Sequence, residues 1–73
     1  MKKYQVEGVL KVCSHVVDYW FRGEKGITSD LAERLELAAE ERAKECIVEG
    51  CVTGELNYEG EEGNYRGWWN IRR

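Results

Sequence analysis

The chain has 73 residues, no proline and a net charge of −3 at pH 7. A chain of this length forms one small domain, expected here over residues 1–73, and buries only about 60–65% of its unfolded surface. Its 11 basic residues are scattered among 14 acidic ones, and no apolar run is long enough to span a bilayer. We therefore expect neither a nucleic-acid partner nor a membrane partner.

The first 22 residues predict strands over residues 3–12 and 16–22, as one bent strand or as two with a kink near Ser14. Apolar side chains alternate from Tyr4 to Val12, and the segment is rich in valine and aromatic residues and contains no alanine, which suits a pleated surface. Residues from Val9 to Phe21 also fit a helical stripe, so a helix over that range stays open as an alternative.

A helix is predicted from Ser29 to Glu49, after a turn at residues 23–26. Thr28, Ser29 and Asp30 all suit an N-cap, and Gly50 is a natural C-terminal stop. Apolar residues at three- and four-residue spacing form one stripe, which consists of Leu31, Leu35, Ala38, Ala39, Ala43, Cys46 and Ile47.

Two further strands are predicted over residues 51–58 and 64–72. The connection 59–63 exceeds two residues, so a bulged or longer hairpin loop is expected. Because neighbours in a strand point to opposite faces, Trp69 is expected in the core, and Trp68 on the other face. The core face would carry Val52, Leu56, Tyr58, Tyr65, Trp69 and Ile71, with Tyr4 also in the core. The predicted fold class is α+β, with one amphipathic helix packed on a small antiparallel sheet.

The chain has three cysteines and one histidine, and an odd number of cysteines does not indicate a disulfide framework. Cys13, His15, Cys46 and Cys51 would suffice for a structural zinc site, although their spacing is not that of a zinc knuckle. Free thiols in a reducing cytoplasm are the favoured interpretation. A cysteine–histidine nucleophile would lack a third group that orients the ring, so we expect no enzyme activity and no cofactor.

The glycine-rich turn carries Glu59, Glu61 and Glu62. Carboxylates in a solvated turn are typical of a segment that stays soluble and discourages edge pairing, and they would also suit a basic partner. Gly54 and Gly67 lie inside predicted strands, which indicates a bulge or the close approach of a ring.

The candidate partner-binding residues are those expected to point away from the helix. Tryptophan beside arginine on an exposed face is typical of an interface. The candidates are Trp20, Arg66, Trp68 and Asn70, together with Glu59, Glu61 and Glu62.

The segments 45–50, Gly54-Glu-Leu56 and Gly67-Trp-Trp-Asn-Ile71 resemble small uncharacterised proteins of phages and mobile elements. Cys51 stands where that pattern has an aromatic residue. The resemblance implies a compact accessory protein that binds and inhibits a host or antiviral-defence protein in the host cytoplasm.

The favoured function is therefore a non-enzymatic protein-binding module. One alternative is a homo-oligomeric protein that binds a small molecule in an aromatic-lined site, and another is a zinc-stabilised domain.

Overall fold

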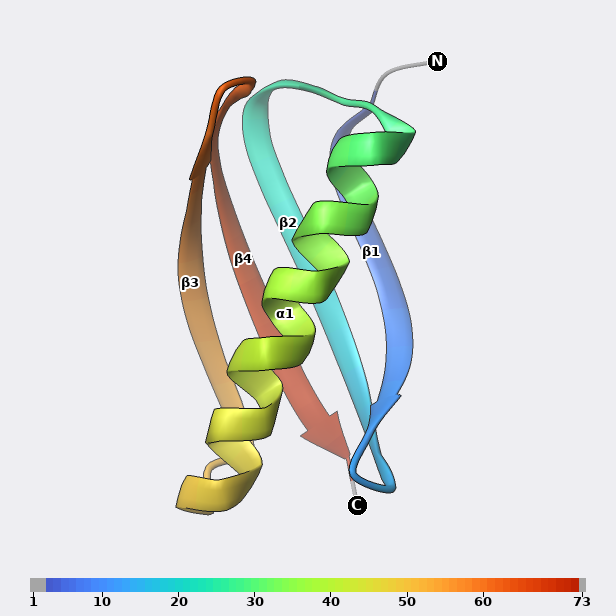
Figure 1. Ribbon diagram of the computed structural model, residues 1–73, viewed down its shortest axis with the longest axis vertical. Coiled ribbons are helices and arrows are strands. Elements are labelled where there is room, and N and C mark those ends of the chain that lie inside the picture. The colour runs from blue at the N-terminus through green and yellow to red at the C-terminus, as the bar shows by residue number, and fades with distance from the viewer. Residues whose placement is uncertain (1–2, 73) are drawn as a thin grey trace.

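A computed structural model describes residues 3–72 and has one helix packed on a four-stranded antiparallel sheet (Figure 1). The elements follow the chain as β1 (Lys3–Val12), β2 (His15–Ile27), α1 (Ser29–Glu49), β3 (Thr53–Gly60) and β4 (Gly63–Arg72). The strand order is β1-β2-β4-β3, so two hairpins meet along the pair β2–β4. This confirms the predicted α+β class.

The first hairpin turns within two residues, Cys13 and Ser14, because Val12 pairs with His15. Both turn residues have positive φ, 50° and 69°, as a tight hairpin turn requires. The segment is therefore two strands rather than one bent strand, and the alternative helix from Val9 to Phe21 is wrong. The valine and aromatic residues pack on the pleated sheet, as their propensity favours.

Strand β2 is longer than predicted and continues through residues 23–26, where the sequence predicted a turn. Gly23 does not bend the chain. It lies opposite Tyr65 of β4, and an added Cβ would stand 2.1 Å from the Tyr65 ring. The glycine makes room for an aromatic ring, and the turn predicted at residues 23–26 is wrong.

Helix α1 has the predicted bounds and caps. The Leu31 backbone N–H donates to the Thr28 hydroxyl oxygen (3.2 Å), and Gly50 ends the helix with φ of 84°, a conformation that glycine adopts without strain. The buried stripe faces the sheet and consists of Leu31, Leu35, Ala39, Ala43 and Cys46.

The second hairpin is tighter than predicted. Gly60 pairs with Gly63, so only Glu61 and Glu62 form the turn, and the expected longer loop is wrong. Gly63 has φ of 140°, which a residue with a side chain rarely adopts. Gly60 and Gly63 flank the turn, and β3 and β4 therefore continue closer to it than the alternation of apolar residues predicted.

Four glycines of the sheet lie opposite aromatic residues of the neighbouring strand. The cross-strand pairs are Gly8–Tyr19, Gly23–Tyr65, Gly54–Trp69 and Gly67–Phe21. A Cβ added at any of these glycines would stand within 2.5 Å of the facing aromatic side chain, a separation that van der Waals contact forbids. Of the two alternatives at Gly54 and Gly67, a bulge or the close approach of a ring, the structure shows the close approach, which lets each ring lie over the backbone of the next strand.

Two residues assigned to the core by the sequence lie outside it. Tyr4 is 68% exposed on the edge strand β1, and Val52 is 45% exposed in the link between α1 and β3. Strand β3 begins only at Thr53, so the alternation that placed Val52 inside does not reach it.

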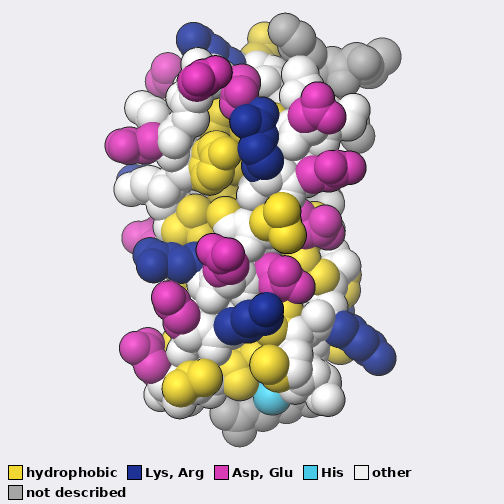
Figure 2. Space-filling view, in the orientation of Figure 1, with side chains coloured by type: hydrophobic (Ala, Val, Ile, Leu, Met, Phe, Trp, Pro, Cys, Tyr) yellow, Lys and Arg dark blue, Asp and Glu magenta, His cyan; other side chains and the backbone are white. Residues whose placement is uncertain are grey.

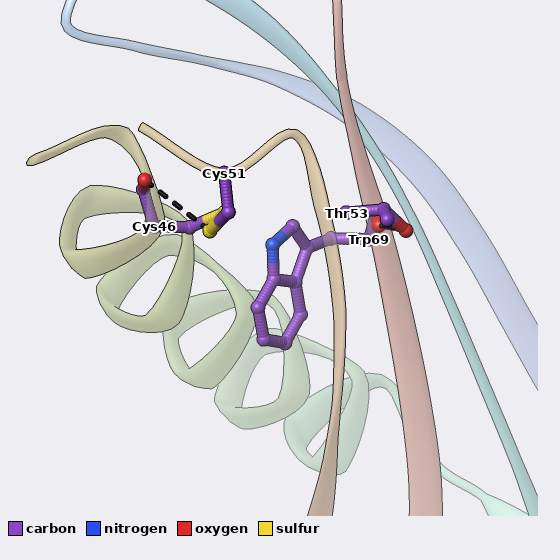
Figure 3. Close-up of a disulfide and its surroundings, with 4 residues drawn as sticks. All are labelled: Cys46, Cys51, Thr53 and Trp69. Carbon is purple, nitrogen blue, oxygen red and sulfur yellow. Dashed lines mark hydrogen bonds between the residues drawn. A yellow bond between two sulfur atoms is a disulfide. The ribbon is translucent and has the colours of Figure 1, made fainter. Parts of the chain in front are cut away.

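A disulfide joins Cys46 to Cys51 across the end of α1 (Figure 3). The Cys51 backbone N–H also donates to the Cys46 carbonyl oxygen (3.0 Å), which holds the two residues close together. The expectation of three free thiols is wrong: Cys13, which is exposed, is the free cysteine. Gly50 turns the chain back on the last helical turn, and that reversal brings the sulfur atoms together.

The disulfide gives a direct expectation for thiol chemistry. Without reductant, one thiol per chain should react with a thiol reagent in denaturant, and all three after reduction. Closing a short loop restricts the unfolded chain, so Cys51→Ser should lower the free energy of unfolding by about 2 kcal/mol. Three reactive thiols before reduction, counted on freshly purified protein, would contradict the bond.

Two buried tyrosines make the fold sensitive to alkaline pH. Burial raises the pKa of Tyr19, and Glu36, which accepts a hydrogen bond from its hydroxyl (3.3 Å), raises it further. Burial, with a smaller effect of Glu62, also raises the pKa of Tyr65, whose hydroxyl donates to the Gly26 carbonyl (3.3 Å).

Because both pKa values are raised, their contribution to stability is complete below pH of about 10 and is lost as the pH rises above it. The urea concentration at the unfolding midpoint should decrease as the pH rises above about 10. In Tyr65→Phe this decrease with pH should be smaller than in wild type. An equal decrease of the midpoint with pH in this variant would show that Tyr65 does not contribute to the loss of stability.

Candidate partner-binding face

The sheet face opposite α1 carries the exposed central side chains. In β2 and β4 these alternate with buried residues such as Phe21 and Trp69. We call this surface the open face. Its central and flanking residues are Gln5, Glu7, Asp18, Trp20, Arg22, Thr53, Glu55, Asn57, Arg66, Trp68 and Asn70.

Trp20 and Trp68 stand directly opposite each other at the centre of the open face. Their ring centroids are 4.9 Å apart and their planes are inclined by 36°, a separation typical of interacting aromatic pairs. Trp20 is 38% exposed and Trp68 is half-buried. The predicted division of the tryptophan pair in β4 is confirmed, since Trp69 is buried on the helix side.

The strand register arranges the open face in rows that run across the sheet. One row reads Glu7–Trp20–Trp68–Glu55, and we call it the tryptophan row. The adjacent row reads Gln5–Arg22–Arg66–Asn57, and we call it the arginine row. Two aromatic side chains flanked by carboxylates thus lie beside two cations flanked by amides.

The arginine row holds two like charges on directly opposed residues, which is unfavourable in a sheet. The guanidinium carbon of Arg22 lies 5.6 Å from the centroid of the Trp20 ring, within the range of a cation–π interaction. Among residues 3–72, neither Arg22 nor Arg66 forms an ion pair, whereas Arg72 pairs with Asp18 (2.9 Å).

Two adjacent hollows occupy the open face, and Trp68 lines both. The first has a volume of about 650 Å³ and includes Val9, Trp20 and Asn70 in its lining. The second has a volume of about 840 Å³ and lies over the arginine row. The surface of the first hollow is therefore largely apolar, and the second is lined mainly by charged and polar residues.

The structure brings together Trp20, Arg66, Trp68 and Asn70 of the predicted candidates. Glu59 lies further along the same face, in the lining of the second hollow.

Glu62 does not belong to this group. It accepts a hydrogen bond from Arg34 of α1 (3.0 Å) and is half-buried. The prediction of a solvated turn is therefore wrong for this residue. Glu61 is exposed in the turn. The three glutamates therefore lie in three different surroundings.

Arg22 is a central residue of the open face that the sequence reasoning missed. Its alternation with Trp20 was the available signal, but the predicted strand stopped at residue 22. The turn expected from Gly23 removed Arg22 from a paired position, although the structure pairs it with Arg66.

Cys13 and His15 lie at the turn of the first hairpin. Cys13 lies in the hairpin turn, and a ring nitrogen of His15, Nδ1, lies 2.9 Å from the Cys13 carbonyl oxygen. The disulfide uses the two other thiols that the zinc alternative requires. Within residues 3–72 no group of three or more histidine, cysteine or carboxylate side chains is placed to hold a metal ion.

The helix side of the molecule has a different character (Figure 2). Helix α1 carries seven acidic and three basic residues, and Figure 2 shows both kinds intermixed, with scattered hydrophobic side chains between them. Large exposed apolar residues on the helix include Leu37 and Val48. These two residues are aliphatic, unlike the aromatic pair at the centre of the open face.

Comparison with known proteins assigns no family: no family model matches the sequence, and neither a curated protein nor a solved structure matches the chain. Within the described part of the chain, α1 is not apolar enough to cross a bilayer.

Proposed function

We propose that the protein is a non-enzymatic binding module that docks another protein on its open face. The close pair of Trp20 and Trp68 at the centre of that face is the observation that carries the proposal. Tryptophan and arginine dominate the binding energy of protein interfaces when they lie near the centre. Here both occur in adjacent rows, and polar residues surround them.

The context of this proposal comes from the resemblance to small proteins of phages and mobile elements. On that basis the partner is a host or antiviral-defence protein, and the site of action is the host cytoplasm. The net charge of −3 favours the approach of a partner that is basic overall. A reducing cytoplasm would open an accessible disulfide, so alkylation of thiols in intact cells tests the compartment: a protected Cys46–Cys51 pair would contradict this location.

The proposed function is tested with the variant Trp20→Ala/Trp68→Ala. We expect the variant to remain folded by circular dichroism and to lose the partner that wild-type protein cross-links in a host lysate. Leu37→Ala/Val48→Ala is the matched control, because it removes exposed apolar groups from the helix side. Equal capture by wild type and by the tryptophan variant would reject the open face as the docking surface.

The first hollow favours the second candidate function, a homo-oligomer that binds a small molecule. Its volume of about 650 Å³ lies within the usual range of ligand pockets. This function requires a dimer in light scattering, tryptophan fluorescence shielded from acrylamide, and a melting temperature that rises with ligand. A monomer with quenchable tryptophan favours the protein-binding proposal instead.

A further inference from the structure

We infer that the partner places an extended segment on the open face, with a large apolar side chain on the tryptophan row and a carboxylate on the arginine row two residues away. This inference rests on the proposed function and specifies the chemistry of the segment. It assigns Arg22 and Arg66 as the anion-binding pair. The partner is thus recognised by an apolar residue and an acidic residue two positions apart, in either order along its chain.

The arginine row has the composition of a carboxylate site. Arg22 and Arg66 are opposed across β2 and β4, and within residues 3–72 no acidic side chain pairs with either. A carboxylate between the two guanidinium groups would offset their repulsion and accept hydrogen bonds from both. Gln5 and Asn57, at the ends of the row, offer amide N–H donors without adding charge.

The surrounding charges favour a single carboxylate over a polyanion. The second hollow is lined by Arg22, Lys25 and Arg66, but also by Glu24 and Glu59. Glu7 and Glu55 close the two ends of the tryptophan row. A chain of phosphates would meet these carboxylates at each further step along the face, whereas the one carboxylate of a peptide fits between Arg22 and Arg66.

The distance between the rows sets the spacing of the pattern. Trp20 and Arg22, like Arg66 and Trp68, are two residues apart in their strands, a separation of about 7 Å along the sheet. Side chains at positions i and i+2 of an extended peptide point the same way at the same separation. A segment that runs along β2 and β4 therefore meets both rows at once.

The row on the other side of the tryptophans determines on which side of the apolar residue the carboxylate lies. It contains Asp18 and Asn70 as an opposed pair, and Asp18 already binds Arg72. An acidic side chain placed there would meet a carboxylate and no free cation. The carboxylate of the partner therefore lies on the arginine side of its apolar residue.

A displayed library of short random peptides, selected on immobilised wild-type protein, tests this inference. We expect enrichment of Asp or Glu two positions from Trp, Phe, Tyr or Leu. For an enriched peptide, replacing its acid by the amide should weaken binding about 10-fold to 100-fold, and the protein variant Arg22→Gln/Arg66→Gln should have the same effect. Arg66→Lys should retain only part of the affinity, because lysine keeps the charge but not the planar fork.

Arg42→Gln is the matched control, since Arg42 is exposed on α1, where it pairs with Glu45 (3.7 Å). Melting temperatures of all variants verify that each protein is folded.

The remaining outcomes separate the two proposals. Enriched peptides that are apolar or basic, depend on Trp20 and Trp68 and ignore the arginines would overturn the carboxylate inference and leave the protein-docking function standing. Tighter binding of a single-stranded oligonucleotide than of any selected peptide would overturn both. Enrichment no greater than on Trp20→Ala/Trp68→Ala protein would also overturn both.

Discussion

Replacing Trp69 by alanine is expected to lower the free energy of unfolding by about 3–5 kcal/mol. Trp69 is only 7% exposed, and its indole lies between the sheet and the end of α1, beside the Cys46–Cys51 disulfide (Figure 3). A folded domain of this length has a total stability of only about 4–11 kcal/mol. The substitution should therefore remove a large share of it.

Trp68→Ala is the matched control, because it deletes the same side chain from the adjacent position on the open face. Its cost should be about 1 kcal/mol or less, mainly from lost contact with Trp20. Urea unfolding followed by circular dichroism measures both variants. Equal losses would indicate a strand register displaced by one residue, since such a slip exchanges the two faces.

Gly67→Ala is expected to destabilise the fold by about 1–3 kcal/mol although it adds a single methyl group. The new Cβ would stand 2.3 Å from the Phe21 ring, and Phe21 is fully buried. The ring has no free space to enter, so it must displace its neighbours in the core. The change in urea midpoint measures this cost.

A double-mutant cycle isolates the cause. Phe21→Leu removes ring atoms that the new methyl group meets, so Gly67→Ala should cost less in that background than in wild type. Asn70→Ala, in the same strand but exposed, controls for a general effect of alanine in β4. A cost that is identical in both backgrounds would contradict steric contact with Phe21 as the cause.

Local patterns in the sequence were sufficient to predict the helix and to predict which face of the sheet each side chain of β4 lies on. Thr28, Gly50 and the apolar stripe fix α1 through interactions within a few residues, and these are visible in the sequence. The alternation around Trp68 and Trp69 similarly predicted which indole is buried. Both inferences depend on periodicity alone.

The features that the sequence did not reveal depend on contacts between distant segments. Gly23 fits a turn by composition, but its role is set by Tyr65, which lies 42 positions later in the chain. The odd cysteine count concealed the Cys46–Cys51 bond, because pairing depends on how Gly50 reverses the chain. The arginine row was missed for the same reason: Arg22 and Arg66 become neighbours only when β2 pairs with β4.

The open face forms only when β2 pairs with β4. The two tryptophans of the central rows come from different hairpins, and so do the two arginines, so the open face spans the junction between two halves of the chain. A ligand that spans this junction binds only the fully assembled molecule and should slow amide hydrogen exchange in both central strands together. A ligand bound to the open face would therefore stabilise the pairing of the two hairpins.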